Sequence, residues 1–343
     1  MTLATWVDRL LDSRALTRPE AGRLVDFLAD PERTDTERVA LLVALRARPE
    51  TTELLVALAS ALRERAIPFV RPPGEAAVDL CGSGGAPRPS FNVSTVSAFV
   101  VRAAGLPVVK HGNRSSRGPC GSSDLLEAMG FPTTTSIGFA RATYRRERIA
   151  FLHAPLFHPA TARVATARRL LGLPTVFNRL GPLVNPARPS VQVVGTPSRA
   201  AAVRTVEALA RLGCPAALAM TSDEGCDEFS PRRPTHVVVR RGRRTTAFVV
   251  YPERYLRPSE TSGDWGALPA EAAAIEARRI LDGGPGARRG SVVLTSGAAL
   301  WLAGRARTLA DGVRAARDAI DSGRARAVER AVAAIAARRR WEA

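Results

Sequence analysis

The stretch AAVDLCGSGGAPRPSFNVSTVSAFVVRAAGLPVV, residues 76–109, decides the fold. Its apolar run from Ala76 to Leu80 ends in a glycine loop, and the segment from Ser94 to Ala104 predicts a helix that Gly105 closes. Val108 and Val109 then begin a second buried strand. This order of strand, loop, helix and strand is the repeating unit of a parallel sheet covered by helices.

The same alternation continues along the chain, and a different pattern precedes it. Further elements are predicted as helices at Ser123–Met129 and Ala201–Leu212, strands at Ile149–Leu152, Val191–Val194 and Ala216–Met220, an antiparallel hairpin of Val237–Arg240 with Thr245–Val250, and helices from Pro269 onward. Residues 1–66 show helical periodicity only, with capping-box spacing from Thr17 to Glu20. We therefore expect an α/β fold, with a mostly parallel sheet covered by helices in residues 74–343 and a smaller all-helical lobe in residues 1–66. Helices around 160–190 are expected to join that lobe.

The composition indicates a globular protein of a reducing compartment. Of the 343 residues, 45% are hydrophobic and 24% are charged, and no apolar run approaches the ~18 residues that span a bilayer. Met1–Leu11 carries Asp8 and Arg9, which disfavours a secretory signal. The four cysteines are scattered, so a disulfide framework or zinc site is not expected. We expect a cytoplasmic protein with no membrane contact.

The net charge of +18 raises the possibility of nucleic-acid binding. However, Lys110 is the only lysine among the 50 basic residues, and the arginines are spread over the whole chain. This distribution favours a codon bias over a cationic surface, so nucleic acid is an unlikely partner. Because lysine is kept only at position 110, we expect Lys110 to have a role that arginine cannot fill.

A phosphate site is suggested where the first strand ends. Gly82-Ser83-Gly84-Gly85 follows the strand, and Asn92-Val93-Ser94-Thr95 opens the helix. Glycines let backbone N–H groups approach a ligand, and a helix N-terminus adds free N–H groups and a positive dipole end. A tight turn would also use these glycines for steric reasons, and each polar residue could be a simple N-cap.

Three further segments carry polar groups that suit an anionic substrate. Lys110-His111-Gly112-Asn113-Arg114 lies where the next parallel strand should end, which is where open α/β sheets bind ligands. Arg168, expected on a helix that begins near Ala160, offers a guanidinium fork for a carboxylate, although a surface salt bridge is the default for any one arginine here. Asp227-Glu228 follows a predicted strand and could hold Mg²⁺ on a polyphosphate.

In their order and spacing, these segments resemble the anthranilate phosphoribosyltransferases of tryptophan biosynthesis. The similarity covers nearly the whole chain and is densest across 79–130, 151–197, including Phe177-Asn178-Arg179-Leu180-Gly181-Pro182-Leu183-Val184-Asn185-Pro186, and 223–230. The resemblance implies the fold of the class II nucleoside phosphorylases, a dimer formed through the helical lobe, and transfer of a phosphoribosyl group from phosphoribosyl pyrophosphate to anthranilate or a related small aromatic acid.

The resemblance also implies roles for individual residues. Phosphoribosyl pyrophosphate would be bound by Gly82, Gly85, Ser90, Asn92, Ser94, Thr95, Lys110 and Ser122. One magnesium would be held by Ser94 and Glu228, and another by Asp227 and Glu228. The aromatic acid would meet Gly82, Asn113, His158, Arg168, Gly181 and Pro182, with Lys110, His111, Asn113 and Arg168 as the catalytic set. The implied reaction is displacement at the anomeric carbon without a dedicated general base, because an aromatic amine is already nucleophilic.

Four positions depart from the family pattern. Ala86 replaces an Asp of the glycine loop, Arg117-Gly118 replaces a Ser-Ser pair, His153 stands at an apolar or aromatic position, and Arg179 stands where Leu is common. These changes leave open a specialised relative with another aromatic acceptor. Two rivals also remain: a non-catalytic relative that binds nucleic acid, and a nucleoside phosphorylase, which would lack the segments around Lys110 and Asn185.

Overall fold

The computed structural model describes residues 1–12, 14–82, 88–115 and 118–338. Its helices are α1 (Leu3–Leu11), α2 (Arg18–Ala29), α3 (Asp35–Ala47), α4 (Thr52–Glu64), α5 (Val93–Ala103), α6 (Ser122–Ala128), α7 (Ile137–Glu147), α8 (Ala154–Phe157), α9 (Pro159–Ala162), α10 (Ala165–Leu171), α11 (Phe177–Leu180), α12 (Arg199–Arg211), α13 (Ala270–Leu281), α14 (Ala287–Leu302), α15 (Leu309–Asp321) and α16 (Arg324–Ala337). Its strands are β1 (Val78–Cys81), β2 (Val108–Gly112), β3 (Ile149–His153), β4 (Val191–Gly195), β5 (Ala216–Ser222), β6 (Thr235–Arg241) and β7 (Arg244–Val250).

Within the described residues, the strands form one seven-stranded sheet in the order β3-β2-β1-β4-β5-β6-β7. The strands from β3 to β5 are parallel, whereas β6 and β7 add an antiparallel hairpin at one edge. The chain first builds outward from β1 to β3 and then returns to place β4 on the other side of β1. The order of the strands therefore reverses between β1 and β4, and such a switch point is where open α/β sheets form a ligand crevice.

Side chains alternate between the two faces of each strand, and each face has its own core. Leu80, Val193 and Leu218 pack into a core with the helices α5 and α13–α16. Val194 and Ala219 instead belong to a core that includes α12 and the N-terminal helices. The helical lobe is thus packed through a continuous apolar core onto one face of the sheet.

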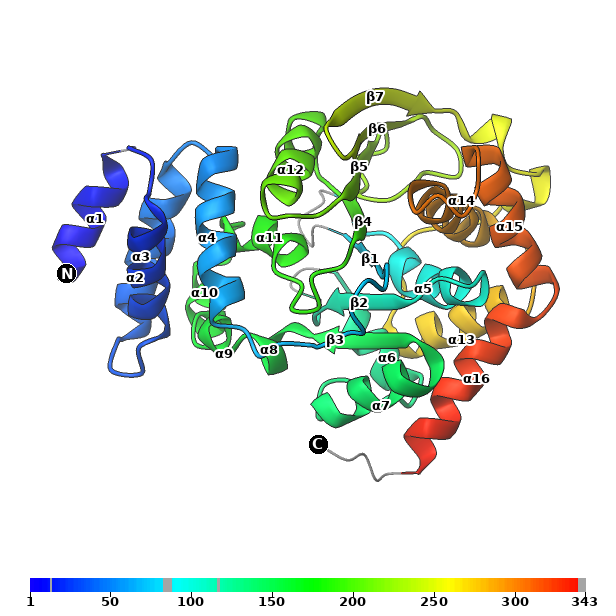
Figure 1. Ribbon diagram of the computed structural model, residues 1–343, viewed down its shortest axis with the longest axis horizontal. Helices are drawn as coiled ribbons and strands as arrows, with labels where there is room; N and C mark the ends of the chain where they lie inside the picture. The colour runs from blue at the N-terminus through cyan, green and yellow to red at the C-terminus, as the bar shows by residue number, and fades with distance from the viewer. Residues whose placement is uncertain (13, 83–87, 116–117, 339–343) are drawn as a thin grey trace.

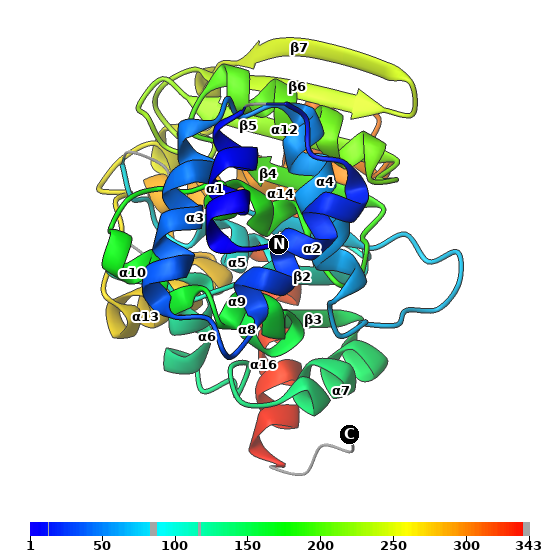
Figure 2. The same ribbon diagram turned by 90° about the vertical axis from the view of Figure 1, so that its left-hand side faces the viewer.

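The helical lobe consists of α1–α4, and the short helices α8–α11 lie next to it, with α9 and α10 below α4 and α11 on its right in Figure 1. Seen from the side of the lobe, α1–α4 stand in front of the sheet (Figure 2). Capping boxes start α2, with Thr17 and Glu20, and α3, with Thr34 and Glu37. Each box satisfies N–H groups that a helix start leaves free, which explains why these helices begin where they do.

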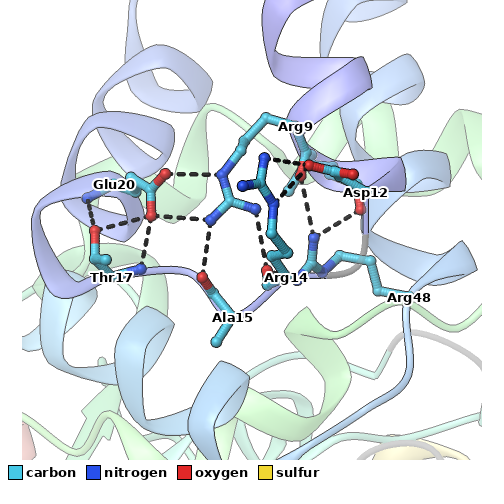
Figure 3. Close-up of polar contacts among 8 residues, drawn as sticks. Arg9, Asp12, Arg14, Ala15, Thr17, Glu20 and Arg48 are labelled. Atoms are coloured by element: carbon cyan, nitrogen blue, oxygen red, sulfur yellow. Dashed lines mark hydrogen bonds and ion pairs between the residues drawn. The ribbon is translucent and has the colours of Figure 1, made fainter.

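Arginine side chains hold the connection between α1 and α2 (Figure 3). Arg9 donates to Glu20 at 2.8 Å and to the carbonyl of Ala15 at 2.8 Å, while Arg48 at the end of α3 donates to the carbonyl of Leu10 at 2.7 Å. The hydrogen bond from Arg9 lowers the pKa of Glu20 to about 2. These contacts use arginines inside the lobe, so they do not form a free cationic surface.

The predicted fold class is confirmed, including the parallel sheet, the N-terminal helices and the antiparallel hairpin. One local prediction is wrong: Arg168 is not on a helix that begins near Ala160. The segment is divided into α9 and α10, because the amide of Val164 bonds the carbonyl of Thr161 three residues back and closes a tight turn. In the described part of the chain, no helix combines the length and apolar character needed to cross a membrane.

Candidate active site

The switch point between β1 and β4 is built around one loop, which carries Asp227. A side-chain carbon added to Gly195, at the end of β4, would lie 1.7 Å from the carbonyl oxygen of Asp227. One added to Gly82, directly after β1, would lie 2.8 Å from the carboxylate oxygen Oδ2 of Asp227. Glycine at both strand ends is therefore what lets this acidic loop approach the sheet so closely.

Lys110 extends from the middle of β2 toward the same point. Its side chain is buried, with 2% exposed, and Nζ donates to the carbonyl of Leu80 at 2.6 Å and to Oγ of Ser94 at 3.1 Å. Leu80 belongs to β1 and Ser94 to the first turn of α5. The ammonium thus joins two strands and a helix N-terminus, which is the geometry that suits a phosphate group.

Asp227 and Glu228 are both buried. Burial, and then the neighbouring charge of Asp227, raise the pKa of Glu228 well above its ordinary value, against the opposing effects of Lys110 and a hydrogen bond from the backbone N–H of Ser94. Among the described residues, Oε2 of Glu228 has no hydrogen-bond partner. A buried carboxylate oxygen in this state needs a proton or a cation.

The oxygen donors at this point fit magnesium. The carboxylates of Asp227 and Glu228 and the hydroxyl of Ser94 are the oxygen ligands that Mg²⁺ prefers, and few protein ligands suffice when substrate oxygens and waters supply the rest. The backbone N–H of Ser94 opposes the rise in the pKa of Glu228, so the start of α5 lies close to this carboxylate.

Several predicted donor-binding residues lie in this region. Asn92 is at the N-cap position of α5 but makes no side-chain capping bond, and its amide instead donates to the carbonyl of Cys120 at 3.1 Å. The hydroxyl of Ser122 accepts from the N–H of Asn113 and donates to its carbonyl, each at 3.1 Å, so the segment after β2 is closed onto the start of α6.

The other predicted donor-binding residues differ in their surroundings. The hydroxyl of Thr95 is buried without a partner among the described residues. Ser90 forms a bridge with Gly266 from a distant loop. The predicted ligand Gly85 lies outside the described residues.

Asp79 is a buried site residue that the motifs did not single out. Its Oδ1 accepts from the backbone N–H of His111 at 3.1 Å, and its Oδ2 accepts from Asn185 at 2.9 Å and from Gln192 at 3.4 Å. Burial raises the pKa of Asp79 to about 6, although Lys110 and these hydrogen bonds oppose the rise. The sequence feature that could have identified Asp79 is a charged residue within the otherwise apolar strand β1.

On the acceptor side, two histidine rings face each other at 5.2 Å in an edge-to-face arrangement, His111 from β2 and His158 before α9. Nδ1 of His111 lies 3.1 Å from the carbonyl of Gly181, so a neutral ring would donate to it. Burial lowers the pKa of His111 well below its ordinary value and that of His158 to about 4. Both rings are therefore uncharged near neutral pH. Gly181 is exposed and Pro182 is buried.

Arg168 lies on α10, half-buried, with its guanidinium carbon 5.9 Å from the centre of the Phe177 ring. Burial lowers its pKa, and no carboxylate of the described residues compensates its charge. No hydrogen bond joins it to Asn113, which is exposed at the end of β2. The structure thus brings together Ser94, Lys110, Asp227 and Glu228, and separately His111, His158 and Gly181.

The family departures that the structure describes are accommodated by specific contacts. His153 lines a small cavity with Lys110 and Ser122, and its Nδ1 lies 2.8 Å from Oγ of Ser123. This places His153 on the side of the predicted donor site. Arg179 pairs with Glu50 of the helical lobe at 3.5 Å. Ala86 and Arg117 lie outside the described residues.

Sequence models of the glycosyl transferase family match most of the chain. The helical bundle domain of this family matches residues 5–66, and its a/b domain matches residues 74–326. The chain is 41% identical over 316 residues to anthranilate phosphoribosyltransferase 2 of Streptomyces coelicolor, covering 91% of this chain and 93% of that protein. It is 37% identical over 315 residues to the anthranilate phosphoribosyltransferase of Geobacillus kaustophilus, covering 92% of each.

Solved structures give the same likeness. The crystal structure of anthranilate phosphoribosyltransferase from Thermus thermophilus superposes with a TM-score of 0.81 at 33% identity, covering 97% of this chain and 99% of that one. The fold is also that of the Saccharomyces cerevisiae protein in complex with phosphoribosyl pyrophosphate and Mg, with a TM-score of 0.86 at 22% identity and 98% coverage of both chains.

Proposed function

Because this chain belongs to the anthranilate phosphoribosyltransferase family, we propose that it transfers the phosphoribosyl group of phosphoribosyl pyrophosphate to anthranilate or a related aromatic acid and releases pyrophosphate. The observation that carries the proposal is the meeting of a buried ammonium, a hydroxyl and a buried carboxylate pair at the sheet's switch point, with Nζ of Lys110 3.1 Å from Oγ of Ser94. Pyrophosphate is an anion that is stabilised by cations, which here would be the ammonium of Lys110 and a magnesium ion held by the carboxylate pair.

We assign the donor to the crevice formed by Gly82, the start of α5 and the ends of β1 and β2. Lys110 would pair with phosphate oxygens as a compact charge, and the N-terminus of α5 would contribute N–H groups. Ser94, Asp227 and Glu228 would hold magnesium, which would neutralise the pyrophosphate as it leaves. The predicted roles of Gly85, Ser90, Asn92, Thr95 and Ser122 in donor binding remain part of this assignment.

The acceptor's carboxylate would pair with the guanidinium of Arg168. Two features support this: the cation is half-buried, and no carboxylate of the described residues neutralises it. The neutral rings of His111 and His158, together with Asn113, Gly181 and Pro182, would line the aromatic part of the site. An uncharged lining suits an aromatic ring and leaves the carboxylate to Arg168.

The chemical step would then depend on alignment. The acceptor's amine nitrogen forms a bond to the anomeric carbon as the bond from that carbon to pyrophosphate breaks, so positive character develops on the sugar and negative charge on the leaving group. The nitrogen then loses one proton to water or to the departing pyrophosphate. Lys110 would stabilise the departing oxygens, while Arg168 and Asn113 would hold the nucleophile in line. An aromatic amine needs no prior deprotonation, so no residue is assigned as a general base.

We also propose that residues 1–66 and 74–343 act as two lobes of one enzyme, that the protein is a cytoplasmic homodimer, and that it serves tryptophan biosynthesis. No finding favours the nucleic-acid alternative. Several arginines are held by contacts inside the fold, as with the buried Arg48, which donates to the carbonyl of Leu10 at 2.7 Å.

The direct test is to incubate the protein with phosphoribosyl pyrophosphate, magnesium and a panel of aromatic acids, and to measure pyrophosphate release. Anthranilate or a close benzoate relative should support turnover. Asp227→Ala combined with Glu228→Ala should abolish turnover and leave the thermal melting temperature nearly unchanged. Full activity of that double variant, or turnover without any aromatic acid, would contradict the assignment.

A further inference from the structure

A cavity of about 200 Å³ lies where the chain crosses between the lobes. One wall is the segment after α4, which includes Arg63 and Phe69, and the other is the segment from Asn185 to Arg188. None of the residues assigned above to donor, acceptor or magnesium lines it. Since one water molecule occupies ~30 Å³ of liquid, the cavity has room for a small polyatomic ion.

The charge of this cavity is one-sided. Two arginines, Arg63 and Arg188, contribute to its walls, and no Asp or Glu does. The guanidinium of Arg63 donates through Nε to the carbonyl of Leu183 at 2.6 Å and through Nη1 to the carbonyl of Leu212 at 3.0 Å. Burial, and then the charge of Arg188, lower the pKa of Arg63 to about 10. Within the described residues, neither guanidinium is paired with a carboxylate, so the cavity carries uncompensated positive charge.

The backbone holds Arg188 in an unfavourable conformation. Its φ is +47°, a region that residues with side chains rarely adopt. The turn is fixed by two internal hydrogen bonds, from the amide of Ala187 to Oδ1 of Asn185 at 2.9 Å and from the amide of Arg188 to the carbonyl of Asn185 at 3.1 Å. Arg71 also donates to the carbonyl of Arg188 at 3.0 Å. Strained residues that the surrounding structure fixes in this way are concentrated at ligand sites.

We propose that this inter-lobe cavity is a binding site for a small anion, a phosphate or a carboxylate, held by Arg63 and Arg188. Guanidinium groups bind both kinds of anion through paired N–H donors. Arg63 is half-buried and Arg188 is exposed, so an anion could enter the cavity from the side of Arg188. Among the described residues, Nη2 of Arg63 has no hydrogen bond and is the donor available to such a ligand.

The cavity is connected to the catalytic region by contacts of its own walls. Asn185 donates to Asp79 at 2.9 Å and to the carbonyl of Val109 at 2.8 Å, and Asp79 in turn accepts from the amide of His111. Arg63 holds the segment that follows Gly181, and its charge also acts on His158. An anion bound here would therefore stabilise the arrangement of β1, β2 and the acceptor-side segment.

The test measures binding of inorganic phosphate by calorimetry in the Lys110→Ala background, which weakens the phosphate site at the switch point. The Lys110→Ala variant should still bind phosphate saturably, and adding Arg188→Gly should weaken this binding at least about tenfold. Glycine accepts the positive φ, so this variant should fold. The matched control is Arg148→Gly, the other arginine with positive φ (54°) among the described residues, which pairs with Glu75 and does not line the cavity. It should leave phosphate binding unchanged.

A second series with malonate distinguishes a carboxylate ligand from a phosphate. Whichever anion binds more tightly identifies the class of ligand, and its binding should show the same dependence on Arg188. Absence of saturable binding for both anions in the Lys110→Ala background, or equal affinity after Arg188→Gly, would overturn the proposal. Because binding is measured without turnover, this outcome is separate from failure of the proposed transferase activity.

Discussion

Lys110 combines two properties that an arginine cannot reproduce. Its ammonium is enclosed, and its two contacts come from different elements, the carbonyl of Leu80 at 2.6 Å and the hydroxyl of Ser94 at 3.1 Å. A guanidinium is wider and planar, so it cannot satisfy both contacts in the same space.

We therefore expect Lys110→Arg to weaken donor binding although the charge is kept. Loss of charge-assisted hydrogen bonds of ~1.5–3 kcal/mol corresponds to a rise of roughly 10–100-fold in the KM for phosphoribosyl pyrophosphate. Steady-state kinetics with Arg211→Lys, a surface arginine paired with Glu53, as control would measure it. An unchanged donor KM would mean that the lysine persists for another reason.

The sequence identified Lys110 by its rarity but could not identify its partners. Leu80 contributes a backbone carbonyl, which no side-chain pattern reveals, and Ser94 approaches from the start of α5. Asp79 was missed for a related reason: its three partners come from β2, from the segment before β4 and from β4 itself. Such convergence depends on the order of strands in the sheet.

The buried carboxyl of Asp79 should make stability depend on pH. In the folded protein its pKa is raised from 3.8 to about 6, so between these values the folded state holds a proton that the unfolded chain releases. The contribution therefore stabilises the protein at low pH and is lost as the pH rises through about 6. The change corresponds to roughly 3 kcal/mol.

Comparison with Asp79→Asn isolates this contribution. The amide does not titrate, and its NH₂ must face the donors that the carboxylate accepts from, so the variant should be less stable than the wild type at low pH. The stability difference should shrink by roughly 2.5 kcal/mol between pH 4 and pH 8, measured by urea denaturation. A difference that stays constant with pH would contradict the assigned ionisation of Asp79.

Arg168 should act on the acceptor alone. Removing the cation that pairs with a desolvated carboxylate costs on the order of 2–5 kcal/mol, so Arg168→Ala should raise the acceptor KM roughly 10²-fold and change donor affinity little. Arg169→Ala is the matched control, because the neighbouring arginine on α10 is exposed and contacts only Thr166 among the described residues. An equal loss for both substrates, or a preferred acceptor that lacks an acid group, would refute this role.

At the scale of elements, strands and longer helices followed from periodicity, whereas short helices did not. The strand β2 extends through Lys110 to Gly112, beyond its apolar start, because pairing with β3 continues to Gly112. The break between α9 and α10 has no proline or glycine to mark it, and it arises from a three-residue hydrogen-bonded turn at Thr161. Packing against the helical lobe determines where such a hydrogen-bonded turn interrupts a helix, and the types of the neighbouring residues do not predict it.

The end of β4 offers a test of how the acidic loop is positioned. A methyl group at Gly195 would overlap the carbonyl of Asp227, so Gly195→Ala should displace the loop that carries Asp227 and Glu228. A misplacement of ~1 Å can reduce turnover about 10²-fold, while overpacking should cost ~1–3 kcal/mol of stability. Turnover and melting temperature should be compared with Gly22→Ala on α2.

Gly22 is a fair control because an added carbon there would meet only the flexible end of the Arg65 side chain, at 3.2 Å. In a helix, alanine in place of glycine should stabilise by ~0.5–1 kcal/mol if that side chain moves aside. Wild-type turnover in Gly195→Ala would show that the close approach of the loop is not needed for catalysis.

At the scale of the molecule, the sequence predicted a separate helical lobe but not how it joins the sheet. The helical periodicity of residues 1–66 indicated buried helix faces but not what covers them. In the structure, Leu24 and Leu58 belong to the same core as Val194 and Ala219 of the sheet. A continuous core of this kind follows from the topology, since α9–α12 provide the contact with the helical lobe.

The helical lobe and the helix α10 that packs against it carry apolar residues that this core does not cover. Val43 on α3 and Leu170 on α10 are exposed, the latter by 69%, and these two helices pack against each other. Exposed apolar groups on adjacent elements are typical of protein interfaces, and a lobe this small benefits from a partner surface. We therefore expect the protein to be a dimer at micromolar concentration, with α3 and α10 at or near the contact.

Light scattering of Val43→Asp combined with Leu170→Asp tests this expectation, because two carboxylates placed in an apolar interface would be desolvated without partners. The double variant should be a monomer with little change in melting temperature beyond the loss of dimer stabilisation. Ile275→Asp on α13 is the matched control, since Ile275 is 71% exposed in the α/β lobe, and it should remain dimeric. A monomeric wild type would refute the dimer. A double variant that stays dimeric would place the contact elsewhere, because a surface that tolerates two buried carboxylates is not its apolar centre.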